Sequence, residues 1–240
     1  SVDIPVKTYA VRPSEDIGFV RVTLIASSSL GQRSATLDVM PVTVQSFDLT
    51  SYNVVGGTNV TGSVTLNSPA PERGATVSLE STLPGVARPM RNWVTVPRGQ
   101  TSVKFTIRTI PVNEGQSVIL RAKRLGTVVT PVDSNGDIAA LVVNRPNLDS
   151  AMFEPATQTG GKPVKLSVTL DGPAPKSGAI VSLVSSDPTT LAVPAQLTVS
   201  SGRKTQTLTL TPTKPGTAKD ITVTVTRGNV SRTATVRITP

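Results

Sequence analysis

The feature that most constrains this chain is an internal repeat with a period of about 100 residues. The segment VTLNSPAPERGATVSL at 64–79 returns as VTLDGPAPKSGAIVSL at 168–183, so equivalent residues lie 104 positions apart. The segment RSATLDVMP at 33–41 returns in the same way as RTATVRITP at 232–240. A unit of this length is too long for a solenoid repeat, and it has the size of one β-sandwich of about 100 residues. We therefore expect sandwich-sized units that each fold around a core of their own.

Short alternations of apolar and polar residues, separated by turn residues, predict β-strands throughout the chain. In the segment 60–66, for example, every second residue is apolar or glycine and the residues between them are threonine or serine. A period of two places one face of each strand on a core and the other in water. The predicted strands of the two complete units are 42–50, 60–66, 75–79, 93–96, 103–107, 118–122 and 138–143, then 164–170, 179–184, 197–199, 205–210, 221–225 and 234–238. The predicted fold class is all-β, with tandem immunoglobulin-like β-sandwich domains of which the first is incomplete.

The repeat divides the chain into residues 1–42, 43–145 and 146–240, of which the last two are complete units. The first part matches only the last three strands of a unit, which we expect at Val2–Ala10, Phe19–Ala26 and Ala35–Val39. Three strands with one apolar face cannot close a sandwich alone. We therefore expect the chain to be a piece of a longer repeat protein, or to carry a half-domain that another chain completes. The boundaries near Pro41 and Pro146 leave very short linkers, so the units are expected to lie end to end with restricted bending.

The composition excludes several kinds of active site. The chain contains no cysteine and no histidine, so disulfides, Cys/His zinc sites and Ser-His-Asp or Cys-His catalytic units are ruled out. Carboxylates that glycoside hydrolysis would need are scattered over predicted turns, at Glu154, Asp171, Asp187 and Asp220. We expect no catalytic residues, no cofactor-binding residues and no enzymatic activity.

The net charge of +9 is spread over residues 43–145 and 146–240 rather than gathered in one run. A sheet that binds RNA stacks bases on aromatic side chains, and only 3% of the residues here are aromatic. No apolar run approaches the roughly 20 residues that span a bilayer. We therefore expect no specific nucleic-acid partner and no membrane insertion.

One loop carries a candidate metal site. Asp133, Asn135 and Asp137 place oxygen-bearing side chains at alternate positions, as at the start of a calcium-binding loop. No glutamate stands at the twelfth position of that loop, which is Asn144, and Asn135-Gly136 is also a strong signal for a hairpin turn. The three residues are a calcium candidate whose alternative is a polar hairpin tip. The surrounding loop, 126–137, is the main insertion relative to the last unit, and loops of this kind often carry binding functions.

The single tryptophan, Trp93, lies on the fourth predicted strand of the first complete unit. A buried tryptophan often anchors the core of an immunoglobulin-like domain, although usually from the third strand. We expect Trp93 to pack in the core rather than to stack on a ligand.

The repeated segments resemble a known family. The segment VVGGTNVTG at 54–62, the pattern VTLxxPAPxxGAxVxL that follows it, and the closing RSATLDVMP and RTATVRITP are similar to tandem bacterial immunoglobulin-like (Big/invasin-like) repeats of large surface or secreted proteins. The resemblance covers nearly the whole chain and implies an extracellular or cell-surface location. Such repeats serve as stalks, spacers, adhesin shafts and filament subunits, so the family has no catalytic residues to transfer.

Our interpretation is a structural or spacer module of an extended secreted or cell-surface repeat protein. One alternative is a filament subunit whose incomplete first domain accepts strands from a neighbouring copy. Another is a carbohydrate- or protein-binding module that acts through loops such as 126–137. The expected partners are neighbouring immunoglobulin-like domains of the same longer chain and other copies of the chain itself.

Overall fold

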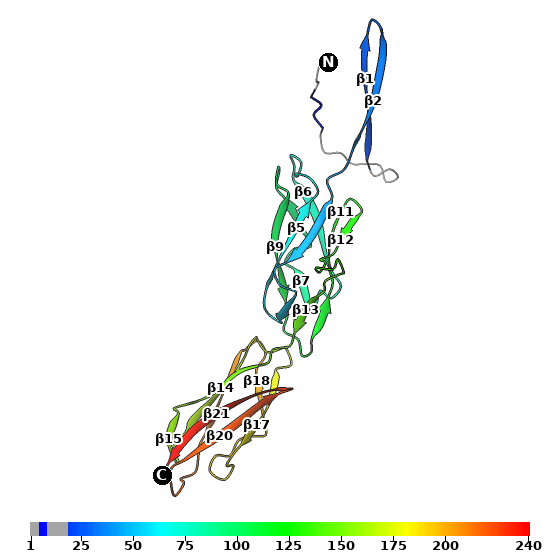
Figure 1. Ribbon diagram of the computed structural model, residues 1–240. Helices are drawn as coiled ribbons and strands as arrows, with labels where there is room; N and C mark the ends of the chain where they lie inside the picture. The colour runs from blue at the N-terminus through cyan, green and yellow to red at the C-terminus, as the bar shows by residue number, and fades with distance from the viewer. Residues whose placement is uncertain (1–4, 9–18) are drawn as a thin grey trace.

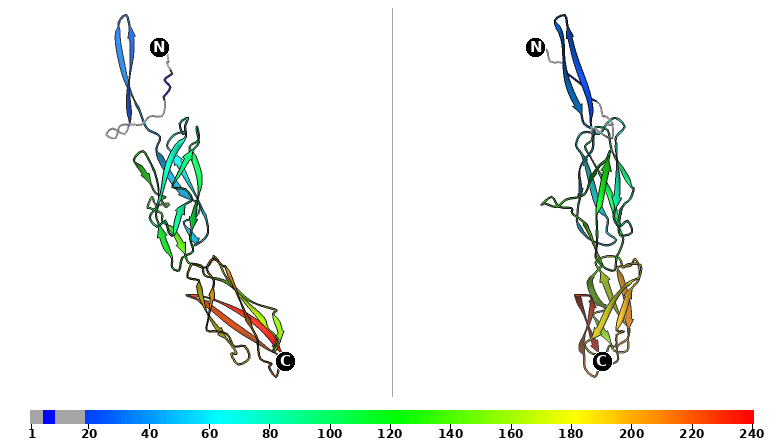
Figure 2. Two further views of the ribbon diagram at one scale, coloured as in Figure 1. Left: turned by 180° about the vertical axis from the view of Figure 1, so that it is seen from behind. Right: turned by 90° about the vertical axis from the view of Figure 1, so that its right-hand side faces the viewer.

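The computed structural model describes residues 5–8 and 19–240, and these residues contain strands and turns but no helix (Figure 1). A hairpin is followed by two β-sandwiches, which we call the first sandwich (residues 42–144) and the second sandwich (residues 146–239). The views in Figures 1 and 2 show these parts one after another along the length of the molecule.

The first sandwich consists of two antiparallel sheets and one small mixed sheet that enclose one core. Its first sheet has the order β3-β5-β9-β7, with β3 (Val44–Leu49), β5 (Val60–Leu66), β9 (Ser102–Thr109) and β7 (Ala87–Pro89). Its second sheet has the order β12-β11-β6-β8, with β12 (Thr127–Val129), β11 (Leu120–Arg124), β6 (Ala75–Ser81) and β8 (Trp93–Val96). Three short strands add a further sheet of order β10-β13-β4, with β10 (Gln116–Val118), β13 (Leu141–Asn144) and β4 (Asn53–Val55).

The second sandwich repeats this plan with two sheets. One has the order β14-β16-β19, with β14 (Leu148–Glu154), β16 (Val164–Leu170) and β19 (Thr205–Leu210). The other has the order β15-β21-β20-β17-β18, with β15 (Thr157–Thr159), β21 (Val230–Thr239), β20 (Lys219–Arg227), β17 (Ala179–Ser185) and β18 (Gln196–Val199).

The repeat extends to the irregularities of strand pairing. The chain enters each sandwich along an antiparallel edge with a bulge, between Val44 and Ser46 in β3 and between Leu148 and Ser150 in β14. It then crosses to pair in parallel with the last strand, as β4 with β13 and β15 with β21. Every other strand pair is antiparallel, which is the pattern of an immunoglobulin-like sandwich. The predicted all-β, immunoglobulin-like fold class is confirmed.

Each sandwich has a core of its own, built from the inward residues of its strands. In the first, Val64, Val77 and Ile107 are fully buried, and in the second Val168 and Val181 stand at the repeat-equivalent positions of the two valines. Each fully buried side chain of this kind contributes about 1.5–3 kcal/mol relative to its exposed state. Separate cores allow each sandwich to be stable without the other.

Three predictions about the first sandwich are wrong. The predicted strand 118–122 is divided, because Val118 ends β10 and Leu120 begins β11, and these two strands belong to different sheets. Trp93 is 49% exposed, because it lies on an edge strand directly opposite Ser78 on the solvent face of β6. Its ring lies against the guanidinium of Arg91, 5.7 Å from the ring centroid, rather than in the core. The predicted strand 138–143 begins later, at Leu141, because Ile138 pairs only with Val132 as an isolated bridge at the base of a loop.

The hairpin before the first sandwich pairs β1 (Val20–Ser28) with β2 (Gly31–Val39) through nine residue pairs. These two strands correspond to the predicted Phe19–Ala26 and Ala35–Val39. Of the predicted strand Val2–Ala10, residues 5–8 are irregular and exposed, and the rest lies outside the described residues. Within the described part of the chain, β1 and β2 pair with no third strand.

Candidate functional site

The loop that follows β11 stands out from the side of the first sandwich, as the right-hand view of Figure 2 shows in green. Leu125 and Gly126 turn the chain between β11 and β12, and both have a positive φ, of 48° and 81°. This two-residue turn type matches the twist of the strands that it joins. Beyond it the loop exposes Val128, Val132 and Ile138, which are 50%, 48% and 59% accessible.

The calcium candidate lies at the tip of this loop. One carboxylate oxygen of Asp133, Oδ1, accepts hydrogen bonds from the backbone N–H groups of Asn135 (2.9 Å) and Asp137 (3.1 Å). The backbone N–H of Asp133 in turn donates to the carbonyl of Asp137 at 2.8 Å, which closes the tip. Among the described residues, no group of three His, Cys, Asp or Glu side chains is placed to hold a metal ion. Calcium binding by Asp133, Asn135 and Asp137 stays a prediction, as does a binding role for the loop.

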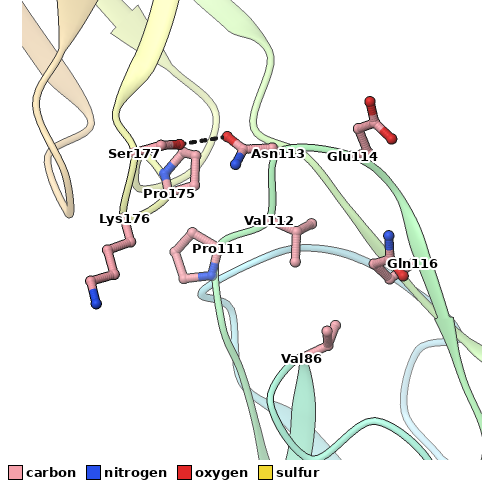
Figure 3. Close-up of a pocket in the computed structure, with 9 residues that line it drawn as sticks. All are labelled: Val86, Pro111, Val112, Asn113, Glu114, Gln116, Pro175, Lys176 and Ser177. Atoms are coloured by element: carbon pink, nitrogen blue, oxygen red, sulfur yellow. Dashed lines mark hydrogen bonds between the residues drawn. The ribbon is translucent and has the colours of Figure 1, made fainter.

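The junction between the two sandwiches is a contact that neither sandwich contains by itself (Figure 3). Gly57 has a φ of +92°, and a Cβ at this position would collide with the ring of Pro173 from the second sandwich. Across the same contact, a Cβ at Gly172 would collide with the Cγ1 methyl of Val55. The two sandwiches therefore approach as closely as they do only because both positions lack a side chain.

A polar contact lies beside this apolar one. The hydroxyl of Ser177 donates a hydrogen bond to Oδ1 of Asn113 at 2.9 Å, and Figure 3 shows the bond crossing from one sandwich to the other. The same figure shows a hollow at the junction, to which Glu114 contributes from the first sandwich and Lys176 from the second. The junction thus combines close packing with a rim that is polar and open to water.

The linker is held by an arginine. In the second sandwich Nε of Arg227 donates to the carbonyl of Pro146 at 2.9 Å, and its Nη1 donates to the carbonyl of Ile180 at 2.9 Å. Asp171 adds two bonds to Asn147, since its Oδ1 accepts the backbone N–H of Asn147 at 2.8 Å and its own N–H donates to the carbonyl of Asn147 at 3.0 Å. The first residues of the second sandwich are therefore fixed to β20 through Arg227 and to the end of β16 through Asp171.

The first sandwich holds its own entering chain in the same way. Nε of Arg124 donates to the carbonyl of Val42, and Nη1 donates to the carbonyl of Thr76, both at 2.8 Å. Arg124 and Arg227 lie 103 positions apart, which is close to the repeat offset. We call this arrangement the linker clamp. The sequence analysis did not identify Arg124, although the offset between Arg124 and Arg227 was a signal that could have identified it.

The electrostatics of the junction centre on its arginines. Burial, with the charge of nearby Arg145 as a second cause, lowers the pKa of Arg227 from its ordinary value. Arg145 also reaches over the turn at Gly228, where a Cβ would collide with its guanidinium. Arg227 is still positively charged, because an arginine guanidinium stays protonated in proteins. Two cations therefore lie close together at the junction, and the carboxylate of Asp171 acts on Arg227 in the opposite direction.

Away from the junction, one carboxylate organises the β17–β18 loop. Oδ1 of Asp187 accepts from the backbone N–H groups of Thr189 and Thr190 at 3.2 and 3.1 Å, while Oδ2 accepts from Nζ of Lys219 at 2.7 Å. The hydrogen bond from Lys219, and then those from the two threonines, hold the pKa of Asp187 well below its usual range. The group therefore caps the loop as a carboxylate, and it has the partners of a structural residue rather than of a catalytic acid.

The chain matches no protein-family model and no curated protein. Solved structures give distant likenesses. The D0-D1 domain of intimin is 15% identical, over 83% of this chain and 100% of its own, with a TM-score of 0.35. An I-band fragment of titin is 11% identical, over 92% and 74%, with a TM-score of 0.33. FdeC, an Escherichia coli adhesin, is 13% identical, over 92% and 74%, with a TM-score of 0.34. The assignment of the fold rests on the strand order of the two sandwiches themselves. No helix long and apolar enough to cross a membrane occurs among the described residues.

Proposed function

We propose that this chain is a spacer: a structural module of an extended protein at the surface of, or secreted from, a bacterial cell, where it forms part of a stalk, an adhesin shaft or a filament. The observation that supports this most directly is the junction. Two sandwiches with separate cores meet end to end through the Gly57–Pro173 contact, and a clamped linker joins them. The location follows the resemblance of the repeat to bacterial surface repeats.

The mechanism is mechanical. Each sandwich folds around its own core, so stability is gained unit by unit and not by the array as a whole. Threonine and serine pairs line the outer faces, for example Thr169 with Thr205 at 3.1 Å and Thr222 with Thr235 at 2.9 Å between hydroxyl oxygens. Such an exterior suits a module whose task is reach rather than chemistry. Loss of bending freedom at the junction then turns chain length into a defined distance.

The stiffness of the junction can be measured directly, because the chain has no cysteine and two introduced cysteines can be labelled alone. Spin labels at Glu80→Cys and Val184→Cys occupy exposed, repeat-equivalent positions on the two sandwiches. Double electron–electron resonance should give a single narrow distance distribution. Gly172→Val should broaden it, since the new side chain collides with Val55.

Gly216→Val is the matched control, because it lies in the second sandwich and a Cβ there has no neighbour within 4 Å. Its distribution should stay as narrow as that of the parent chain. A broad distribution in the parent chain would contradict the proposal, since a freely bending pair of domains sets no distance.

A second candidate function is favoured by the hairpin. Val22 and Leu24 on its apolar face are 39% and 38% exposed, and a sheet face of this kind is suited to accept strands from another copy of the chain. A filament subunit should therefore increase in mass with concentration in sedimentation experiments. The double variant Val22→Thr and Leu24→Thr should reduce that increase, and a chain that stays monomeric at every concentration would rule this function out.

A further inference from the structure

The far end of the second sandwich repeats the surface on which the first sandwich receives its neighbour. We propose that the turn at Gly160–Gly161 is a docking surface for a further sandwich of the same repeat, which would be seated through its Pro-Ala-Pro loop. The inference rests on the proposed spacer function and deepens it, because it assigns a partner to one defined turn.

The backbone of the two turns is the same. Gly56 N–H donates to the carbonyl of Asn144 at 2.9 Å, and Gly160 N–H donates to the carbonyl of Thr239 at 2.9 Å. Two residues after each of these glycines, the N–H of Thr58 or Lys162 closes the turn on the residue before the glycine at 3.1 Å. The second glycine of each pair has a positive φ, of 92° at Gly57 and 84° at Gly161. The surface that contacts Pro173 in the first sandwich is therefore also built in the second.

Glycine is required at the first position of both turns by close contacts inside the sandwich. A Cβ at Gly56 would lie 2.7 Å from the carbonyl oxygen of Ile110, and a Cβ at Gly160 would lie 2.8 Å from that of Thr213. This internal contact holds the turn against the loop after β9 in one sandwich and against the loop after β19 in the other. The position of the second glycine at the surface is thus fixed before any neighbour docks.

The outer sides of the two second glycines differ. Gly57 touches Pro173 of the next sandwich, whereas at Gly161 only Cε of Lys214, at 3.9 Å, comes near a Cβ among the described residues. Lys214 is exposed and stands where the first sandwich has Pro111, so its flexible chain can move aside. The docking surface on the second sandwich is accessible, and its counterpart on the first is covered.

The linker agrees with this placement. Pro240 is equivalent to Arg145, the residue directly before Pro146, because Thr239 pairs with Thr159 at the end of the second sandwich as Asn144 pairs with Val55 at the end of the first. A sandwich joined at Pro240 would therefore approach the Gly160–Gly161 turn from the direction that the second sandwich takes toward Gly56–Gly57. Because a short linker holds the partner close, a modest contact is enough to fix it.

The test appends a copy of residues 146–240 directly after Pro240 of the full chain, so that Pro146 of the copy follows Pro240 as it follows Arg145 in the existing junction. Spin labels at Val184→Cys in the second sandwich and at the same position of the copy report the new junction, while Glu80→Cys with Val184→Cys reports the existing one. We expect a narrow distribution at the new junction. Gly172→Val in the copy should broaden it, and Gly216→Val in the copy should leave it narrow.

The outcomes separate the two proposals. A narrow existing junction with a broad new one would overturn the docking surface and leave the spacer function standing. Two broad junctions would overturn both. A new junction that stays narrow when the copy carries Gly172→Val would also overturn the inference, because the docking would then not use this loop. Circular dichroism and thermal unfolding of each variant test whether the copy is folded. A broad distance distribution can then be assigned to the junction and not to unfolding of the copy.

Discussion

The hairpin β1–β2 and the hairpin β20–β21 have the same design and opposite surroundings. Their nine residue pairs coincide when the numbers are shifted by 199, so that the pair Val22–Leu37 corresponds to Ile221–Val236. Ile221 is fully buried in the second sandwich, whereas Val22 is 39% exposed. The comparison shows that local sequence sets how a hairpin pairs, while a facing sheet decides whether its apolar side is covered.

What covers the second hairpin is visible in the same chain. The inward residues of β20 and β21 belong to one core with inward residues of the other sheet, such as Leu166 and Val168 of β16. The first hairpin has no such sheet among the described residues, and an isolated two-stranded hairpin is marginally stable in water. Its ion pair between Arg21 and Asp38, at 2.7 Å, is exposed and stabilises it little.

The largest expected effect comes from giving the first hairpin the missing sheet. A chain in which residues 146–218 replace residues 1–19, directly before Val20, should form a third sandwich, because Val20 is equivalent to Lys219. Amide hydrogen exchange in β1 and β2 should slow by orders of magnitude, to rates like those of β20 and β21. Unchanged exchange in β1 and β2 would show that the two hairpins are not equivalent.

Alanine substitutions at equivalent positions of the two hairpins should have unequal costs. Ile221→Ala should destabilise the second sandwich by about 2–5 kcal/mol, because it opens a cavity in the core. Val22→Ala should change the stability of either sandwich by less than about 0.5 kcal/mol, as expected for a surface change. Urea unfolding measures both, and equal costs would mean that the first hairpin is packed in solution.

A smaller effect is expected where the two hairpins differ in sequence. Ser28 stands at the position of Arg227, so only the second hairpin carries the linker clamp. Arg227→Ala leaves the carbonyls of Pro146 and Ile180 without their partner, and it should lower the stability of the second sandwich by about 1–3 kcal/mol. Thermal unfolding reports this loss. Arg237→Ala, which removes only an exposed ion pair with Asp220, is the control and should cost less than about 1 kcal/mol.

The smallest effect is a pH dependence of the stability of the second sandwich, which arises at the ion pair between Asp187 and Lys219. The first hairpin has no counterpart of this pair, because Val20 stands at the position of Lys219. Because the pKa of Asp187 is lower in the folded state than in the unfolded chain, its contribution is complete above about pH 4 and is lost as the pH falls below that value. Asp187→Asn should make the stability of the second sandwich less dependent on pH in this range. An identical loss of stability in acid for the parent and the variant would show that Asp187 is not responsible.

The strands were predictable where a local rule decides them. The predicted segments 60–66 and 164–170 coincide with β5 and β16, because alternation on a half-buried strand is visible in the sequence itself. Trp93 was placed wrongly, since its side of β8 depends on its pairing with Ser78 and not on its own chemistry. The predicted start of a strand at Ile138 was wrong for a similar reason. Ile138 lies in a projecting loop, although the sequence from Ile138 onward continues the pattern of β13.

The junction could not be predicted from the sequence. Gly57 and Gly172 both read as ordinary turn glycines, and their contacts with Pro173 and Val55 arise only when two sandwiches meet. The linker clamp was hidden for another reason. Arg124 and Arg227 donate to backbone carbonyls, and a carbonyl acceptor is present at every residue, so nothing in the sequence marks the partner.

The central claim is that the two sandwiches form one stiff unit. Residual dipolar couplings of the backbone N–H groups test this most directly, because each sandwich reports its own alignment in the same sample. We predict that one alignment tensor fits the couplings of both sandwiches in the orientation shown in Figure 1. Two tensors of clearly different magnitude would show that the sandwiches reorient independently, and that result would contradict the account.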